Sequence, residues 1–280
     1  MAFNKRSLGA VAFLAMLAMP VPDATAHDES KYPDWSGQWR RPRGLATQWD
    51  QDKKAGLAQE APLKPEYLEK LKWSMADQAA GGQGLDNRYT CITNGMPRIM
   101  GVIQPIEFVL LPHITYIHFE AFMPRRIYTD ARDFPKDAEP SFAGYSIGKW
   151  SDTDGDGRFD TLDVETRNFK GPRTVEFTGI PLHEDNQTIV KETISLDKSN
   201  PDIMHNIITI IDNAFTRPWT VTKDYRRGPQ ARPLWRESEC IESNSHVLIA
   251  NEHYMISWDG LLMPAKKNQS PPDLRYFDKK

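Results

Sequence analysis

Short apolar and β-branched runs recur along most of this chain, and their spacing limits the fold more than any other feature. The runs are separated by Gly, Pro, Asp and Asn, which favour turns. Strands that follow one another at such intervals, without the alternating helices of an α/β fold, are typical of an antiparallel barrel or sandwich. We therefore expect an all-β protein, with strands over residues 106–111, 114–122, 145–150, 161–169, 174–178, 188–196, 203–212 and 219–225 and a last hairpin over 247–250 and 253–257.

One helix is expected, peripheral to the barrel and close to the N-terminus. Pro65 suits the first turn of a helix, Glu66 favours the positive end of the helix dipole, and Gly81 can end the helix. Within it, helical spacing predicts an apolar stripe that packs against the barrel. The stripe consists of Tyr67, Leu68, Leu71 and Met75.

Residues 1–26 have the pattern of a secretory signal peptide. Lys5 and Arg6 precede an apolar run over 8–19, and Ala24 and Ala26 give the small-x-small cleavage pattern. The run is shorter than the roughly 20 residues that a helix needs to cross a bilayer, and no later segment resembles a membrane span. We expect a periplasmic or secreted protein, cleaved near Ala26, with a single domain over 27–280 whose tail, 266–280, runs along the surface.

The chain has two cysteines, Cys91 and Cys240. In an oxidising compartment an isolated pair most simply forms one disulfide. The alternative, a reactive thiol or a metal ligand, has no C-x-x-C spacing to support it.

The charge and the short motifs exclude several partners. The formal net charge is −3, and no basic stripe is present, so nothing supports nucleic-acid binding. The sequence has no P-loop and no dinucleotide-binding fingerprint, so no organic cofactor is expected. Cofactors that carry phosphate groups are therefore not expected.

The alternating strands indicate where a binding site would lie. Over 114–122, the two-residue period of a strand puts Tyr116, His118 and Glu120 on one face, and the other face is mostly apolar. Over 203–212, His205 shares its face with apolar residues. This pattern fits a barrel with a partly polar lumen, and it also fits an ordinary two-layer core.

Five short motifs are spread over the chain. They are Asp34-Trp35-Ser36-Gly37-Gln38-Trp39, Cys91-x-x-x-Gly95-Met96-Pro97-Arg98, Arg125-Arg126-Ile127-Tyr128-x-Asp130-x-Arg132, Gly144-x-Ser146-Ile147-Gly148-x-Trp150 and Arg217-Pro218-Trp219-Thr220. The first resembles the first strand of lipocalin-like barrels, and the other four together resemble a family of secreted bacterial proteins. Most members of that family have no assigned function, and the resemblance implies a lipocalin-like β-barrel without an established activity.

The strongest catalytic hypothesis concerns the face that carries His118. A histidine near a carboxylate and a guanidinium can transfer a proton on a carbonyl-containing substrate while the arginine stabilises the developing oxyanion. The alternatives are a structural Glu–Arg pair across neighbouring strands and a histidine that is only hydrogen-bonded. The candidate residues are Tyr116, His118, Glu120, Arg126 and His205.

Residues 152–163, DTDGDGRFDTLD, match the ligand spacing of an EF-hand calcium loop. Strands are expected on both sides, so we predict a structural Ca²⁺ that holds a β-hairpin rather than a pair of EF-hand helices. The alternative is a solvated acidic turn. The expected ligands are the carboxylates of Asp152, Asp154, Asp156, Asp160 and Asp163 and the backbone carbonyl of Arg158.

Two other site types have weaker support. The histidines are scattered and lack the spacing of a zinc site. Ser146 lies in a Gly-x-Ser-x-Gly stretch, but a hydrolase elbow needs a helix after the serine, and here the acidic loop follows. We interpret Ser146 as a strand residue.

Together these patterns predict a secreted β-barrel that binds a small apolar or aromatic molecule. Cofactorless proton transfer on that molecule, of the lyase, hydratase or isomerase type, is the first hypothesis. A binding or carrier protein without catalysis is the second. Carbohydrate binding or cleavage is a third, based on the tryptophan content, although no pair of carboxylates stands out.

Overall fold

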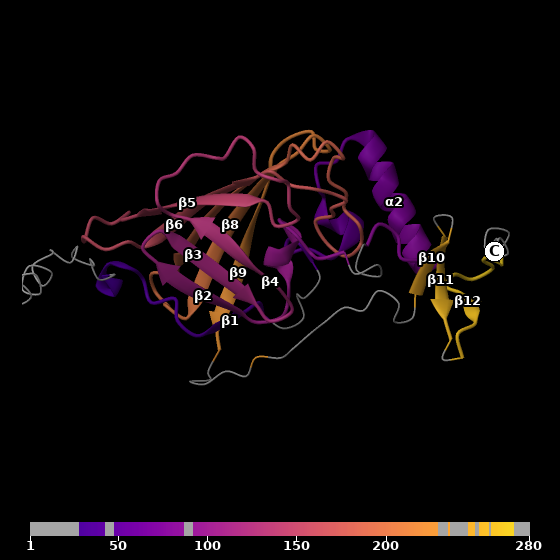
Figure 1. Cartoon of the computed structure of the whole chain (residues 1–280), viewed down its shortest axis with the longest axis horizontal. Helices are drawn as coiled ribbons and strands as arrows, with labels where there is room; N and C mark the ends of the chain where they lie inside the picture. The colour runs from indigo at the N-terminus through magenta and orange to yellow at the C-terminus, as the bar shows by residue number, and fades with distance from the viewer. Residues whose placement is uncertain are drawn as a thin grey trace, which may run out of the picture.

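The computed structural model describes residues 28–42, 48–86, 92–228, 235, 246–249, 252–257 and 259–271. One set of strands closes into a barrel, and the last three form a separate sheet (Figure 1). The barrel strands are β1 (Gln38–Arg40), β2 (Ile106–Leu111), β3 (Ile114–Phe119), β4 (Phe122–Tyr128), β5 (Tyr145–Ser151), β6 (Thr161–Arg167), β7 (Ile189–Leu196), β8 (Ile203–Ile211) and β9 (Trp219–Arg227). The helices are α2 (Pro65–Ala79) and the short 3-10 helices η2 (Glu29–Lys31), η3 (Gly56–Gln59) and η5 (Arg98–Gly101).

The expected all-β barrel is confirmed, but its strands are not all antiparallel. β1 closes the barrel, because Trp39 pairs with Ile106 of β2 and with Arg227 of β9. β4 and β5 run parallel, with Ile127 opposite Ser146, so the prediction of a purely antiparallel barrel is wrong at this pair. Parallel neighbours need a long crossover in place of a tight hairpin turn, and the chain between β4 and β5 supplies it. A lipocalin barrel has eight antiparallel strands, whereas this one has nine and is mixed.

The predicted strand over 114–122 is two strands. The chain turns at Glu120, and Phe119 of β3 pairs with Phe122 of β4 across that turn. Glu120 therefore does not share the strand face of His118, as the two-residue period suggested.

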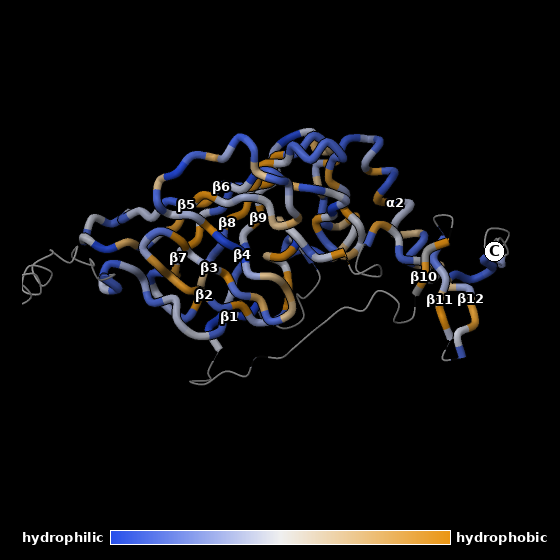
Figure 2. Tube along the Cα trace, in the orientation of Figure 1, coloured by the Kyte–Doolittle hydropathy of each residue, from blue (hydrophilic) through white to orange (hydrophobic). Residues whose placement is uncertain are grey.

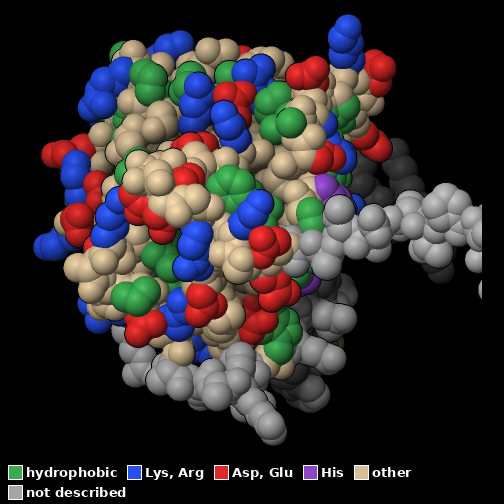
Figure 3. Space-filling model, turned by 90° about the vertical axis from the view of Figure 1, so that its left-hand side faces the viewer, with side chains coloured by type: hydrophobic (Ala, Val, Ile, Leu, Met, Phe, Trp, Pro, Cys, Tyr) green, Lys and Arg blue, Asp and Glu red, His purple; other side chains and the backbone are tan. Residues whose placement is uncertain are grey.

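Alternate residues of the barrel strands point inward and pack closely. Figure 2 shows the hydrophobic positions along these strands, and Figure 3 shows acidic and basic side chains intermixed over one outer face. Complete burial of an Ile or Leu side chain contributes about 1.5–3 kcal/mol, so this core accounts for much of the drive to fold. Its members, each at most 1 % exposed, include Trp39, Ile106, Ile117, Ile127, Leu162, Val190, Ile194, Met204, Ile208 and Ile210.

The predicted helix is confirmed, and it packs on the segment 174–184. Tyr67 and Leu71 of the predicted stripe are buried, and Ser74 Oγ donates a hydrogen bond to the carbonyl of Thr178 at 2.8 Å. The strand expected over 174–178 is wrong, because only an isolated bridge forms there. No helix of the described residues is both long and apolar enough to cross a membrane.

The C-terminal strands β10 (His246–Ile249), β11 (Glu252–Ile256) and β12 (Leu262–Pro264) form a separate sheet at the α2 end of the molecule (Figure 1). The predicted last hairpin is confirmed by the pairing of β10 with β11, while β12 was not predicted. Lys266 Nζ contacts Asp77 of α2 at 2.6 Å and Glu252 of β11 at 3.2 Å. The start of the expected surface tail is thus attached to α2.

Two predictions lie outside the described residues. The predicted signal peptide, residues 1–26, is not described, and neither are Cys91 and Cys240 of the expected disulfide. Both remain predictions.

Candidate functional site

Tyr116 and His118, at the centre of the expected catalytic cluster, lie on the outer face of the barrel. Ile117 between them is fully buried, whereas both of them are partly exposed. On the neighbouring strands, Tyr116 is opposite Arg126 and His118 is opposite Glu107. The expectation that these side chains line the lumen is wrong, because the register turns the alternate, more apolar set of β3 inward.

Arg125, next to the predicted Arg126, places a positive charge inside the barrel. Its guanidinium forms a bidentate ion pair with Glu192, with Nη1 3.0 Å from Oε1. It also donates hydrogen bonds to Thr166 Oγ1 at 2.9 Å and to Ser146 Oγ at 3.2 Å. Each of these four side chains is at most 2 % exposed, and Arg126 is exposed.

Ser146 belongs to this buried network, as a strand residue of β5. Its hydroxyl is 2.9 Å from that of Thr166, and β5 continues after it without the helix that a hydrolase elbow requires. Asn206 completes the network by donating from Nδ2 to Glu192 Oε1 at 2.9 Å. The lumen is therefore partly polar, as predicted, but its polar groups contact one another.

His205 is on the outer side of β8, between two carboxylates. Nδ1 is 2.7 Å from Asp224 Oδ1, and Nε2 is 3.1 Å from Asp197 Oδ2. Partial burial works against protonation, but the hydrogen bonds to both carboxylates outweigh it and raise the pKa of His205 above its usual range. Strands β2, β1 and β9 separate it from His118, so the two histidines do not face one cavity.

In the acidic loop, three of the predicted calcium ligands converge. One carboxylate oxygen each from Asp152, Asp154 and Asp156 lies within 4.8 Å of the other two. Asp152 is oriented by the backbone N–H of Gly155, 2.7 Å from Oδ1, and by that of Gly157, 2.9 Å from Oδ2. Carboxylate oxygens at this spacing could contact one Ca²⁺, which takes oxygen ligands at about 2.3–2.6 Å.

The other predicted ligands are used differently. Asp160 Oδ2 accepts a hydrogen bond from Thr153 Oγ1 at 2.6 Å. Asp163 lies within β6, where it accepts a hydrogen bond from Thr193 at 2.7 Å. The backbone N–H of Arg158 donates to the aspartate triad. Asp163 lies outside the converging triad, because the strand begins two residues before it.

A groove of about 470 Å³ lies at the end of the barrel where β5 begins, β6 ends and β7 begins. Its walls come from residues 134–140, 167–170 and 185–189, and Phe134 and Tyr145 contribute aromatic rings. These segments are far apart in the sequence, and the barrel topology brings them together. The volume lies in the range of about 300–1,000 Å³ that is usual for small-molecule sites.

The aromatic wall of the groove is held in place from behind. Tyr145 stacks on Tyr128 with ring centroids 5.0 Å apart and an interplanar angle of 24°. The Arg132 guanidinium lies 3.9 Å from the Tyr128 ring centroid and donates to the Tyr145 hydroxyl at 3.2 Å. Asp130 anchors that guanidinium, and their hydrogen bonds lower the pKa of Asp130 to about 2. A wall fixed in this way requires little ordering when a ligand binds.

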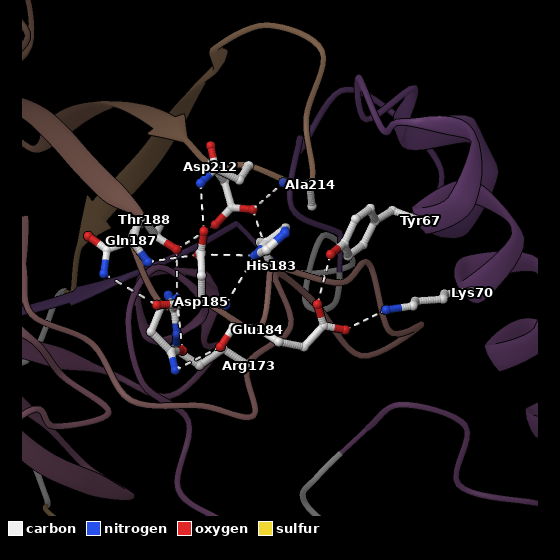
Figure 4. A network of polar contacts seen from close by, with 12 residues as sticks. Tyr67, Lys70, Arg173, His183, Glu184, Asp185, Gln187, Thr188, Asp212 and Ala214 are labelled. Carbon is white, nitrogen blue, oxygen red and sulfur yellow. Dashed lines mark hydrogen bonds and ion pairs between the residues drawn. The ribbon is translucent and has the colours of Figure 1, made fainter.

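Behind the 185–189 wall lies a polar network (Figure 4). Arg173 Nη2 donates to Thr188 Oγ1 at 2.6 Å and is 3.5 Å from Asn186 Oδ1. Thr188 Oγ1 in turn donates to Asp212 Oδ2 at 2.5 Å. The other oxygen of Asp212 accepts the backbone N–H of His183 at 2.9 Å. The network fixes the turn that forms the groove wall.

His183 connects this network to α2. Its Nδ1 accepts the backbone N–H of Asp185 at 3.0 Å, so the neutral ring carries its proton on Nε2. The Tyr67 ring lies 5.6 Å away, and its hydroxyl donates to Glu184 Oε2 at 2.7 Å. Hydrogen bonds from Lys70 and Tyr67 lower the pKa of Glu184 to about 2. The carboxylate of Asp185 lines the groove and is 3.1 Å from His183 Nδ1.

Lys223 is a further buried titratable group, at the β9 side of the barrel. Its Nζ donates to the Trp49 carbonyl at 2.5 Å and lies 3.7 Å from the centroid of that ring. Complete burial, with a contribution from the nearby Arg41 guanidinium, lowers the pKa of Lys223 well below its usual range. Because the side chain is 0 % exposed, it serves the fold rather than a solvent-accessible reaction.

The sequence patterns did not predict the groove residues, because those patterns concern the faces of strands. Asn168, Lys170 and Asp185 lie in connections between strands, where no periodicity points to a shared face. A usable signal was present in the polar run His183-Glu184-Asp185-Asn186 directly before β7. Loops that meet at one end of a barrel are a common place for binding residues.

No protein-family model, curated protein or solved structure matches this chain. The resemblance to secreted bacterial proteins therefore remains a prediction. The volume of the groove, its fixed aromatic wall and its polar network support it as the candidate binding site.

Proposed function

We propose that the protein binds a small molecule with an aromatic or apolar part in the groove at the start of β5. The observation that carries this proposal is the groove of about 470 Å³, lined by Phe134 and Tyr145 on one side and by the polar turn 185–189 on another. Aromatic rings supply apolar contact, and a few placed polar groups orient the ligand. We retain the periplasmic or secreted location that residues 1–26 predict.

Cofactorless proton transfer on the bound molecule is the second candidate. Its geometric support comes from Asp185, whose carboxylate lines the groove and can accept and return a proton. The originally expected residues, Tyr116, His118 and Arg126, give no such support, because they lie on the outer face of the barrel.

Calorimetry with benzoate, phenol and indole as probes tests the binding proposal. We expect at least one probe to bind, and Tyr145→Ala to weaken it about tenfold, because a lost aromatic contact is worth about 1 kcal/mol or more. Mass spectrometry of the same mixtures would detect turnover.

Tyr116→Ala, which removes a tyrosine from the outer face of β3, is the matched control and should leave the affinity unchanged. Equal losses of probe affinity in the two variants would exclude the groove as the binding site, and so would the absence of binding to every probe.

We further propose that the aspartate triad of the β5–β6 hairpin holds a structural Ca²⁺. The convergence of Asp152, Asp154 and Asp156 supports this site. EGTA should lower the thermal midpoint by roughly 5 °C, since a ligand that binds only the folded state stabilises it, and Ca²⁺ but not Mg²⁺ should restore it.

Two variants show whether the Ca²⁺ ligands are the aspartate triad alone or the full set that the EF-hand spacing predicts. Asp154→Asn should abolish most of the response to EGTA, whereas Asp163→Asn should keep it, because Asp163 is on β6 and bonds to Thr193. A midpoint that EGTA leaves unchanged would argue that the loop is a solvated acidic turn.

A further inference from the structure

A small cavity lies between the segment 92–98 and residues 172–174, apart from the groove. Its volume is about 10 Å³, and Arg98, Arg173 and Thr174 are among the residues that line it. A volume of about 10–15 Å³ on this measure holds one water-sized particle. The cavity is thus suited to a single compact occupant.

Arg173 is the unusual member of this lining. Its side chain is 8 % exposed, and its guanidinium lies 4.5 Å from the Phe169 ring centroid. Nη2 bonds to Thr188 on the groove side, whereas Nε and Nη1 have no hydrogen-bond partner in the described chain. A buried donor without a partner usually destabilises a fold by about 1–3 kcal/mol, so such donors are normally satisfied.

The charge of Arg173 also lacks a direct counter-ion. Arg98, across the cavity, pairs with Asp86 at 3.0 Å and donates to Thr174 Oγ1 at 3.0 Å. Among the described residues no carboxylate comes within ion-pair distance of Arg173. Burial lowers the pKa of Arg173 to about 10, and the more distant Asp212 and Asp185 offset this only in part. Among the described residues, the charge of Arg173 beside the cavity is therefore only partly compensated.

We propose that this cavity is a binding site for a compact monovalent anion, such as chloride, held by the guanidinium of Arg173. A monovalent anion matches the single charge of Arg173, and its size matches the cavity. Sulfate is too large and carries twice the charge. A neutral water could satisfy the donors but would leave the charge unchanged, so the two occupants are distinguishable.

Thermal unfolding at constant ionic strength tests the site without any groove ligand. The midpoint should be about 3 °C higher in sodium chloride or bromide than in sodium sulfate, because only the folded state binds the anion. Arg173→Met, which keeps the length of the side chain, should remove the difference. Arg167→Met, on the groove wall, is the matched control and should retain it.

Diffraction from wild-type crystals soaked in bromide gives a second measurement that does not depend on a variant folding. The proposal expects an anomalous peak between Arg98 and Arg173. No peak there, together with equal midpoints in chloride and sulfate, would overturn it and assign the cavity to water.

Discussion

Glu192→Gln should lower the free energy of unfolding by about 3–5 kcal/mol, because it leaves the buried guanidinium of Arg125 without its counter-charge. Both side chains are at most 2 % exposed, and the bidentate pair lies inside the barrel with Thr166 and Ser146 as the remaining acceptors. Urea denaturation at pH 7 measures the change.

Two further variants show whether the loss comes from the unpaired charge. Glu165→Gln removes a carboxylate on the adjacent strand β6 that forms partly exposed ion pairs, and it should lose no more than about 1 kcal/mol. The double variant Arg125→Met/Glu192→Met removes both charges and should recover most of the stability. A loss below about 1 kcal/mol in Glu192→Gln itself would contradict the electrostatic explanation.

Glu176→Gln should change the pH dependence of stability by about 3 kcal/mol. Glu176 is 3 % exposed, and burial raises its pKa to about 7, although hydrogen bonds from Thr178 and Gly56 and the charge of Arg98 act in the opposite direction. Its Oε2 has no hydrogen-bond partner in the described chain. The folded state thus favours the neutral carboxylic acid, which glutamine resembles in shape.

The raised pKa of Glu176 fixes the direction in which stability changes with pH. The stability contributed by protonated Glu176 is fully present below the unfolded pKa, near 4.5, and it is lost as the pH rises through about 7. Wild-type protein should therefore lose about 3 kcal/mol from this group between pH 4.5 and pH 8, whereas Glu176→Gln should not.

Urea denaturation at several pH values measures this difference. Glu69→Gln, on the exposed side of α2, should retain the wild-type profile. If the profile of Glu176→Gln also matches that of the wild type, Glu176 is ionised in the folded state at neutral pH.

The elements were largely predictable because their signals are local. Turn residues separate the strands, and Pro65 marks the start of α2 as expected. The turn at Glu120 was missed because it contains neither Gly, Pro, Asn nor Asp. The parallel pairing of β4 with β5 was missed because strand order depends on the path of the long connection between them.

The candidate site was less predictable than the fold. The acidic loop was predicted from its spacing, but Asp163 follows the register of β6 and lies outside the converging triad. Arg126 was chosen where Arg125 is the buried residue, since neighbouring arginines look equivalent until their strand is placed. The groove residues come from three distant segments that share no pattern.

The sequence by itself determined most of the strands and the helix, because turn chemistry and apolar periodicity act over a few residues. Only the tertiary structure decided which face of each strand is inside. β3 and β8 carry apolar residues on both faces, and a shift of one residue in register exchanges the faces. Packing of the closed barrel therefore put Ile117 and Arg125 inside and His118 and Arg126 outside. As a result, the candidate site is the groove at the end of the barrel and not the lumen.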